Sequence, residues 1–255
     1  MEEREIIQSL AGIGVPAVKY YTQVGSTNDV ALEWAKEGTP EFSLVVADTQ
    51  TTGRGRLNRE WVTKPGEGLA FSLVLRPKPN EQIPLFSALG GIAVCETLIQ
   101  AFHLPTLIKW PNDILVHEKK VCGILAEAHW DESPTVVLGI GINVGEGSIP
   151  SSDHLNFPAT TLETEMSHPV DRTLALTEVV KQLILWRERL GTTEFLTYWN
   201  EHLAFTGKLV QVTLVGKKTE GILKGINAEG NLQIQKENGT TIGVEMGDVQ
   251  LRPIE

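Results

Sequence analysis

The stretch QTTGRGRLNREW, from Gln50 to Trp61, carries a local charge that is unlike the rest of the chain. The formal net charge of the whole chain is -10. Three of the arginines nevertheless fall within six residues: Arg54, Arg56 and Arg59. Gly53 and Gly55 flank the first arginine, so the backbone can adopt positive φ and approach a ligand closely. Such a loop suits a polyanion that binds and leaves, such as the phosphates of a nucleotide. The alternative is a solvated basic surface loop, because short motifs often match by chance.

Composition limits the kinds of protein to consider. The 255 residues can form one large domain or two unequal ones, and 41% hydrophobic residues can build a core large enough for an enzyme. The acidic balance argues against general affinity for nucleic acid or anionic membrane, so any phosphate site must be local. Cys95 and Cys122 lie far apart and form no metal-ligand or disulfide pattern, which is typical of a reducing compartment. The sequence shows no signal peptide and no apolar run of about 20 residues.

The segment Ser26-Thr27-Asn28 stands between a predicted strand, Val18 to Val24, and a predicted helix, Asn28 to Glu37. Ser26 with Asp29 three residues later is a capping-box pattern, so these polar residues can simply start the helix. A turn from strand to helix also brings backbone amides and hydroxyls together around a small polar ligand. Capping and ligand binding are therefore compatible here.

The remaining pattern predicts a mixed α/β fold followed by a small all-β segment. Up to residue 203 it predicts strands at 43–48, 69–75, 107–110, 113–117, 121–130 and 135–144, a turn at 118–120, a loop at 148–155, and helices at 2–11, 84–102, 171–190 and 193–203. From Thr206 short β-branched runs are separated by turns, which is typical of a five-stranded barrel. We place a domain boundary there, giving domains 1–205 and 206–255. The second domain has six basic and six acidic residues, so it is not an electrostatic module for nucleic acid.

Lys109-Trp110-Pro111-Asn112-Asp113 lies between two predicted strands and can be a turn with Trp110 in the core. That account leaves Lys109 unexplained, because it follows an apolar strand and a buried ammonium group needs an anion. A phosphate or carboxylate ligand would supply one. Lys120 and Gly123 repeat this combination, with a lysine at the start of a strand and a glycine where backbone must come close.

The run GIGINVG, from Gly139 to Gly145, does not fit a dinucleotide-binding fingerprint. Val144 stands where the third glycine is needed, and Ser148-Ile149-Pro150 prevents a following helix. The run instead predicts a core strand whose glycines let another backbone or a flat ring lie against it, with Asn143 as a candidate polar contact. The sequence shows no serine nucleophile elbow, no paired Cys/His and no metal-spaced histidines.

Five motifs in this order resemble those of a bacterial biotin protein ligase: Gly25–Asn28, Gln50–Trp61, Lys109–Asp113, Lys120–Glu127 and Gly139–Asn143. The resemblance implies a mixed α/β catalytic domain, like class II tRNA synthetases and lipoate ligases, with an SH3-like C-terminal barrel. It implies an ATP-dependent ligase that makes biotinyl-5′-AMP and transfers biotin to a lysine of the biotin carboxyl carrier protein of a carboxylase. Mg²⁺ would activate the reaction, no metal ligand is identified, and the enzyme would be cytoplasmic and able to form a homodimer, without binding DNA or membrane.

The same resemblance assigns roles to individual residues. Ser26, Thr27 and Gln50, with the loop backbone near Arg54 to Arg56, would hold the ureido ring of biotin, and Trp61 and Gly123 would wall its tail. The whole substrate set is Ser26, Thr27, Asn28, Gln50, Gly53, Arg54, Gly55, Arg56, Trp61, Lys109 and Gly123. The nucleotide set is Arg56, Arg59, Lys109, Asn112, Lys120 and Asn143, and the catalytic set is Lys109, Arg54 and Arg56. Asp113 is a candidate base for the transfer step.

Two departures from the family pattern lead to further expectations. Many relatives begin with a winged-helix DNA-binding domain, whereas here about 17 residues precede the first strand, so we expect no repressor activity. Ala159-Thr160-Thr161 occupies the adenine-side loop, where some relatives carry a bulky aromatic residue. The alternatives are a lipoate ligase or another carboxylate-adenylating ligase, and a non-catalytic biotin-sensing regulator, which would need a DNA-binding segment.

Overall fold

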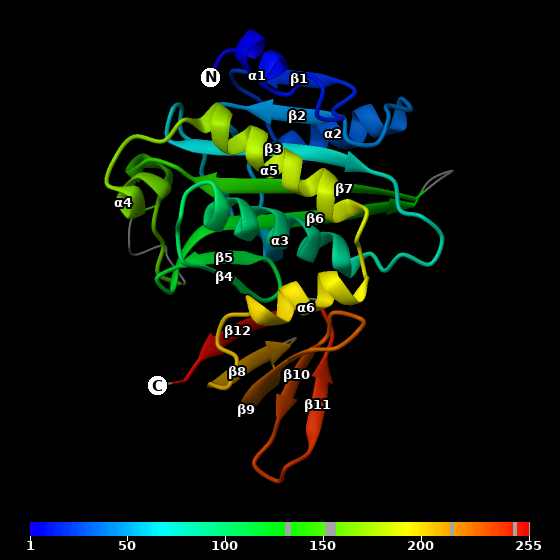
Figure 1. The fold of residues 1–255 in the computed structure, drawn as a ribbon, viewed down its shortest axis with the longest axis vertical. Coiled ribbons are helices and arrows are strands. Elements are labelled where there is room, and N and C mark those ends of the chain that lie inside the picture. Colours follow the sequence, from blue (N-terminus) through cyan, green and yellow to red (C-terminus); the bar gives the residue numbers. More distant parts are fainter. Residues whose placement is uncertain (131–133, 151–156, 215–216, 247–248, 255) are drawn as a thin grey trace.

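A computed structural model describes residues 1–130, 134–150, 157–214, 217–246 and 249–254, arranged around two separate β-sheets (Figure 1). The predicted loop at 148–155 lies partly outside the described residues. Among the described residues, no helix combines the length and apolarity needed to cross a membrane.

The large sheet is mixed and has seven strands in the order β1-β2-β3-β7-β6-β5-β4. Its strands are β1 (Val18–Tyr21), β2 (Leu44–Ala47), β3 (Gly68–Leu75), β4 (Thr106–Lys109), β5 (Asp113–Val116), β6 (Lys119–Trp130) and β7 (Pro134–Asn143). Only β1 and β2 run parallel, and the other neighbouring pairs are antiparallel. Strand β3 is buried along its whole length, as the continuous apolar run predicts.

Helices cover the two faces of this sheet unequally. The long helix α3 (Pro84–Gln100) packs on β4 to β7, and α5 (Arg172–Arg187) packs against α3 and against α1 (Glu3–Ser9). Figure 1 shows α3 and α5 crossing the same face of the sheet. A Cβ atom on Gly90 of α3 would lie 3.0 Å from Ile124 and 3.3 Å from Leu138, so this glycine lets the helix pack closely on the sheet. The opposite face carries α2 (Thr27–Lys36), which contacts β2, β3 and β7.

The second sheet is antiparallel and has five strands in the order β11-β10-β9-β8-β12. These strands are β8 (Leu209–Leu214), β9 (Lys217–Ile226), β10 (Leu232–Gln235), β11 (Thr241–Val244) and β12 (Val249–Pro253). The indole N–H of fully buried Trp110 donates to the Gly230 carbonyl at 3.0 Å. The Ile226 amide donates at 2.9 Å to the side chain of Asn200, in the last turn of α6 (Thr193–Glu201). These bonds hold the C-terminal sheet beside the loop that follows β4.

Two details differ from the sequence expectation. The hairpin turn between β5 and β6 consists of His117 and Glu118, both with positive φ, so Lys119 and Lys120 already belong to β6 rather than to the turn. The short helix α4 (Leu162–Met166) was not predicted, and its first turn is capped by the Thr161 side chain, which accepts from the Thr164 amide. Its five residues are too few to show a helical period.

Candidate functional site

A cavity of about 550 Å³ lies on the α2 side of the large sheet, below the arginine-rich loop. Its lining includes fourteen of the fifteen residues that the sequence analysis assigns to substrate and nucleotide: Ser26, Thr27, Asn28, Gln50, Arg54, Gly55, Arg56, Arg59, Trp61, Lys109, Asn112, Lys120, Gly123 and Asn143. Gly53 is the exception, because it is buried inside the loop where a Cβ atom would overlap the Trp61 carbonyl. Residues from five separate motifs are thus brought around one cavity.

One end of the cavity is lined by buried, uncharged hydrogen-bonding groups at the start of α2. The Thr27 amide donates to Gln50 Oε1 at 2.8 Å, and Gln50 Nε2 donates to the Thr63 hydroxyl at 3.3 Å. Ser26 is 4% exposed and occupies the N-cap position, but its side chain makes no capping hydrogen bond. The capping-box interpretation of Ser26 is therefore wrong, and the capping explanation does not account for its hydroxyl.

Asn28 is packed against the sheet rather than turned to solvent. Its amide nitrogen donates to Glu127 Oε2 at 2.6 Å, and its amide oxygen lies 2.6 Å from the Ser72 hydroxyl on β3. A Cβ atom at Gly139 would overlap the Asn28 amide oxygen. The glycine on β7 is thus the reason that Asn28 can lie flat on the sheet.

Trp61 forms an aromatic wall over a glycine patch on the same sheet face. Gly123 on β6 and Gly141 on β7 are directly opposite each other in the antiparallel register. A Cβ atom on Gly123 would lie 2.9 Å from the indole ring, and one on Gly141 would overlap it. The expectation that glycines in this strand admit a flat ring is confirmed at Gly141.

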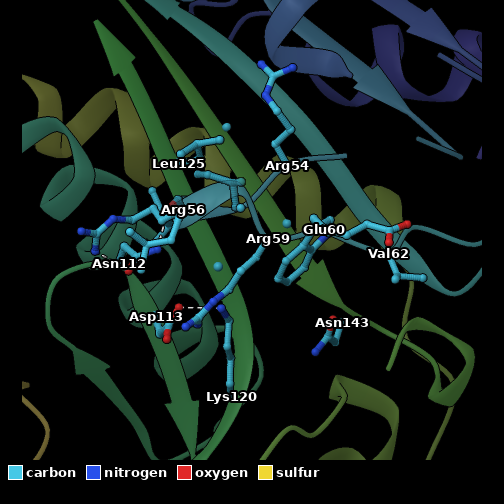
Figure 2. Close-up of a pocket in the computed structure, with 18 of the residues that line it drawn as sticks. Arg54, Arg56, Arg59, Glu60, Val62, Asn112, Asp113, Lys120, Leu125 and Asn143 are labelled. Atoms are coloured by element: carbon cyan, nitrogen blue, oxygen red, sulfur yellow. Dashed lines mark hydrogen bonds and ion pairs between the residues drawn. The ribbon is translucent and has the colours of Figure 1, made fainter. Parts of the chain in front are cut away.

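The arginine loop is closed by backbone bonds, from the Gly55 amide to the Arg59 carbonyl at 2.7 Å and from the Trp61 amide to the Gly53 carbonyl at 2.9 Å. Its arginines point in different directions. Figure 2 shows Arg59 extending toward Asp113 and Lys120, whereas Arg54 extends away from them. The Arg56 guanidinium donates to the Asn112 side-chain oxygen at 3.1 Å.

Arg54 lines the cavity, but its guanidinium bonds to residues that do not line it. Its guanidinium donates two hydrogen bonds to Asp29, at 2.8 and 2.6 Å, and lies 3.4 Å from Glu127. The hydrogen bonds to Asp29, with the charge of Glu127, raise the pKa of Arg54, although burial opposes the rise. This geometry gives Arg54 the role of anchoring the loop to α2. It gives no support to a direct catalytic role for Arg54, which stays a prediction.

Two lysines share one carboxylate at the other end of the cavity. Lys109, only 4% exposed, has its ammonium nitrogen 3.1 Å from Asp113 Oδ2, and that of Lys120 is 2.6 Å from Asp113 Oδ1. Burial lowers the pKa of Lys109, and Asp113 offsets only part of this effect. Burial would raise the pKa of Asp113, but the two ammonium groups outweigh it and hold that pKa below its usual value. A carboxylate with both oxygens so committed is a poor proton acceptor, so the geometry does not support Asp113 as a base.

The nucleotide-side residues meet the loop that precedes α4. The Asn143 side chain donates to the Thr160 carbonyl at 3.2 Å, and the Thr160 amide donates to the Lys120 carbonyl at 2.9 Å. The adenine-side loop named in the sequence analysis is therefore attached to both strands that line the cavity. Ala159 of this loop lines the cavity directly.

Phe157, Leu251 and Arg252 also line the cavity, although they belong to none of the five motifs. Leu251 and Arg252 belong to β12. This strand lies in the predicted second domain, whose balanced charge gave no indication of a role in ligand binding. The Arg252 guanidinium lies 5.5 Å from the centre of the Phe157 ring, and burial, followed by the nearby Arg59 charge, lowers the pKa of Arg252. The sequence does contain one feature that could have drawn attention to Arg252, because it is the only arginine after residue 189.

The lining has a charge opposite to that of the chain. Six of its residues are cationic and two are anionic: Arg54, Arg56, Arg59, Lys109, Lys120 and Arg252 against Glu60 and Asp113. The formal excess is four positive charges inside a chain of net charge -10. Such a site attracts an anion, and its uncharged end with the Trp61 wall suits a neutral ring with hydrogen-bonding groups.

Comparison with known families gives two matches along the chain. Residues 20–143 match the biotin/lipoate A/B protein ligase family, and residues 205–252 match the biotin protein ligase C-terminal domain. A bifunctional ligase/repressor of Bacillus spizizenii is 35% identical over 230 residues, covering 86% of this chain and 70% of the relative. A biotin–[acetyl-CoA-carboxylase] ligase of Mycobacterium tuberculosis is 30% identical over 98% of this chain and 95% of its own.

A solved structure supports the same relationship in three dimensions. The biotin protein ligase of Aquifex aeolicus, in complex with biotin and ATP, superposes with a TM-score of 0.81 at 32% identity. The match covers 94% of this chain and 100% of the other. It therefore includes both the large sheet and the C-terminal sheet.

Proposed function

The chain belongs to the biotin protein ligases, and from that membership we infer that it is an ATP-dependent ligase that activates biotin and transfers it to a lysine of an acceptor protein. The observation that carries this function is the cavity itself. A buried uncharged end, an aromatic wall over glycines and a cationic end follow one another around a single space of about 550 Å³. These three parts suit, in order, the ureido ring, the aliphatic tail and the carboxylate of biotin beside the phosphates of ATP.

Activation needs no base, because the carboxylate of biotin is ionised at neutral pH. A carboxylate oxygen attacks the α-phosphorus of ATP, the bond to the β-phosphate oxygen breaks, and pyrophosphate leaves with the bonding electrons. The product is biotinyl-5′-AMP. The protein must hold the two anions in line and neutralise the charge that develops on the α-phosphate oxygens.

We assign this charge neutralisation chiefly to Lys109 and Arg56. Lys109 is almost fully buried, so its ammonium acts through a medium of low dielectric. The Arg56 guanidinium is held at the cavity by its hydrogen bond to Asn112, whereas the Arg54 guanidinium is bonded to Asp29. Arg59, Lys120 and Asn143 complete the nucleotide side, while Ser26, Thr27 and Gln50 hold the ureido ring. Trp61 and Gly123 enclose the tail.

Mg²⁺ enters this scheme as part of the nucleotide substrate. Both oxygens of Asp113 already bond to lysines, and among the described residues no three His, Cys, Asp or Glu side chains gather as metal ligands would. These residues do not fit a resident metal site. A magnesium ion held mainly by the phosphates and water is the usual arrangement for a nucleotide substrate.

In the transfer step the amine of an acceptor lysine attacks the biotinyl carbonyl carbon, the bond to the phosphate oxygen breaks, and AMP leaves. The attacking amine must first lose a proton, since its ordinary pKa is about 10.4. We propose that the acceptor is the biotin carboxyl carrier domain of a carboxylase. The name of the mycobacterial relative, which specifies acetyl-CoA carboxylase, supports this assignment.

Three further proposals concern the protein as a whole. We propose domains at residues 1–205 and 206–255, and the two separate sheets support that division. We propose a cytoplasmic location, supported by the two free cysteines, Cys95 and Cys122, both of which are buried. We also propose that two copies can associate through an edge strand of the large sheet, which sedimentation velocity would test.

One experiment tests the proposed function against its alternatives. The protein is mixed with ATP, Mg²⁺, a carboxylase acceptor domain and either biotin or lipoate, and the acceptor is weighed by mass spectrometry. We expect the acceptor to gain one biotinyl group and to stay unmodified with lipoate. Modification with lipoate would favour a lipoate ligase, and no modification with either acid would favour a non-catalytic biotin-binding protein.

A further inference from the structure

Two lysines line the end of the cavity where the proposed activation takes place. Lys109 lies on β4 and Lys120 lies on β6. Biotinyl-5′-AMP, the product of that activation, is a mixed anhydride, and it reacts next with the amine of an acceptor lysine. The enzyme therefore holds an acylating agent beside two lysines of its own, and it must avoid the reaction that it performs on its acceptor.

Acylation of Lys109 would follow the same course as the transfer step. The lone pair on Nζ would attack the biotinyl carbonyl carbon, the bond to the phosphate oxygen would break, and AMP would leave with the bonding electrons. The nitrogen would lose one proton to solvent and become an amide. That amide is uncharged and would keep biotin attached inside the cavity, so each event would inactivate one enzyme molecule. A protonated ammonium group cannot begin this reaction, because it has no lone pair.

The surroundings of Lys109 favour loss of its proton. The residue is 4% exposed, and burial lowers its pKa. The charges of Arg252 and Lys120 lower that pKa further. Burial and a neighbouring cation are the conditions that activate lysine in enzymes that use it as a nucleophile. The centre of the Phe157 ring lies 4.6 Å from Lys109 Nζ, but a ring face carries no full negative charge.

Asp113 supplies the charge that opposes these effects. It lies directly opposite Lys109 in the antiparallel register of β4 and β5. Its Oδ2 is 3.1 Å from Lys109 Nζ, and its Oδ1 is 2.6 Å from Lys120 Nζ. The charge of Asp113 and its hydrogen bond raise the pKa of Lys109 against the effect of burial. The carboxylate is 14% exposed, so water screens this attraction only weakly.

We propose that Asp113 protects Lys109 from acylation by biotinyl-AMP, because its carboxylate keeps the ammonium group protonated while the intermediate is held beside it. This role rests on the proposed function. It suits a carboxylate that is a poor base, since Asp113 retains a proton on a lysine of the enzyme instead of removing one from the acceptor. Lys109 is then the position at which the protein biotinylates itself once the carboxylate is lost.

The test compares two variants that differ only at position 113. Lys120→Met keeps the Asp113 carboxylate, which then pairs with Lys109 alone. Asp113→Asn/Lys120→Met removes one negative and one positive charge together, so the formal charge of the three-residue cluster stays at its wild-type value. Asp113→Asn alone would leave two ammonium groups side by side without their anion, and the double variant avoids that threat to folding.

Each protein is incubated with synthetic biotinyl-AMP at neutral pH without an acceptor, and the biotinylated lysines are located by mass spectrometry of its peptides. Supplying the intermediate makes the result independent of the rate of adenylation. Lys119, which is exposed on β6, records the slow modification by reagent that is free in solution. Native mass spectrometry at short times shows how much biotinyl-AMP each protein holds.

We expect Lys109 to stay unmodified in wild type and in Lys120→Met. In Asp113→Asn/Lys120→Met it should acquire biotin at least about tenfold faster than in Lys120→Met, because one pKa unit changes the neutral fraction of an amine about tenfold. Adding Lys109→Arg to the double variant should abolish modification at this position, since a guanidinium stays protonated. Modification at Lys119 should be the same in all four proteins.

Four results would overturn the proposal. They are faster modification of Lys109 than of Lys119 in wild type, equal modification of Lys109 in the two variants, loss of biotinyl-AMP binding in the double variant, and failure of the double variant to fold. The last two count because they would show that Asp113 serves ligand binding or folding instead. A wild-type protein that does not bind biotinyl-AMP would refute the proposed function as well, whereas binding without acylation in the double variant refutes this inference alone.

Discussion

Replacing Lys109 by alanine separates a catalytic role of this lysine from a purely structural one. Its ammonium nitrogen is 3.1 Å from Asp113, and a second lysine, Lys120, is 2.6 Å from the other oxygen of the same carboxylate. The carboxylate therefore keeps a counter-charge when Lys109 is removed. The structure predicts a small loss of stability and a large loss of adenylation.

The magnitudes follow from this shared arrangement. Removing the only partner of a buried charge costs about 3–5 kcal/mol. Here one charge-assisted bond is lost while the other remains, and the desolvation cost of Lys109 disappears with it. We expect the free energy of unfolding to fall by about 1–2 kcal/mol, which lowers Tm by about 2–8 °C. Formation of biotinyl-AMP should slow at least about a hundredfold, a rise of about 2.7 kcal/mol in the barrier.

The assay is single-turnover formation of biotinyl-AMP by rapid quench at saturating biotin and ATP, normalised to the folded fraction from a thermal melt. Lys119→Ala is the control, because Lys119 is an exposed lysine on β6 beside the site. Lys109→Arg should restore only part of the rate, since a planar guanidinium replaces a compact ammonium. If the rate of folded Lys109→Ala stays within threefold of wild type while Tm falls, Lys109 only holds Asp113 and the catalytic assignment is wrong.

Three other predictions test the loop and the lysine pair. Arg56→Ala should speed the dissociation of biotinyl-AMP about a hundredfold, a loss of roughly 1.5–3 kcal/mol for its charge-assisted bonds, with an unchanged melt, and an unaltered off-rate would contradict the assignment. Trypsin should cut the loop Thr51–Glu60 quickly in the free protein and slowly with biotin and ATP, whereas equal rates would remove the idea that ligand orders it. The lowered pKa of Asp113 means that its stabilisation is present above about pH 4 and is lost as pH falls through the lower folded pKa. Asp113→Asn should therefore lower the free energy of unfolding at pH 7 by about 3–5 kcal/mol and flatten its decline below pH 4 in urea titrations.

The sequence predicted the elements and the gathering of the site, because both depend on local signals. Apolar runs and glycine or proline punctuation placed every strand of the large sheet within a few residues. Fourteen of the fifteen residues predicted from the five motifs line one cavity.

Side-chain direction was not predictable, since it depends on partners distant in the chain. Ser26 occupies the first position of a good capping box, yet its hydroxyl makes no cap, while Asp29 of the same box is engaged by Arg54. Both residues satisfy the pattern for a local role. Only the fold reveals that the Arg54 loop lies over α2, which gives Asp29 a stronger partner than a backbone amide.

The contribution of the second domain to the cavity could not be predicted from the sequence either. The net charge of residues 206–255 is zero, which presents this segment as electrostatically inert. The position of Arg252 in the cavity depends on how the two sheets dock through Trp110 and Gly230. No periodic pattern within either sheet encodes that docking.

The pairing of Gly123 with Gly141 links correct folding of the sheet to the existence of the cavity. Successive residues of a strand face opposite sides, so a slip of one residue would exchange the two faces of β7 relative to β6. It would bring Ile140 or Ile142 beneath Trp61, and it would turn Gly139 and Gly141 of β7 toward α3. The same apolar side chains are buried in the core only in the native register. Burial of that core thus disfavours the misaligned register, because a strand in that register loses its hydrophobic contacts. The same contacts that stabilise the fold therefore also ensure that the cavity has its correct shape.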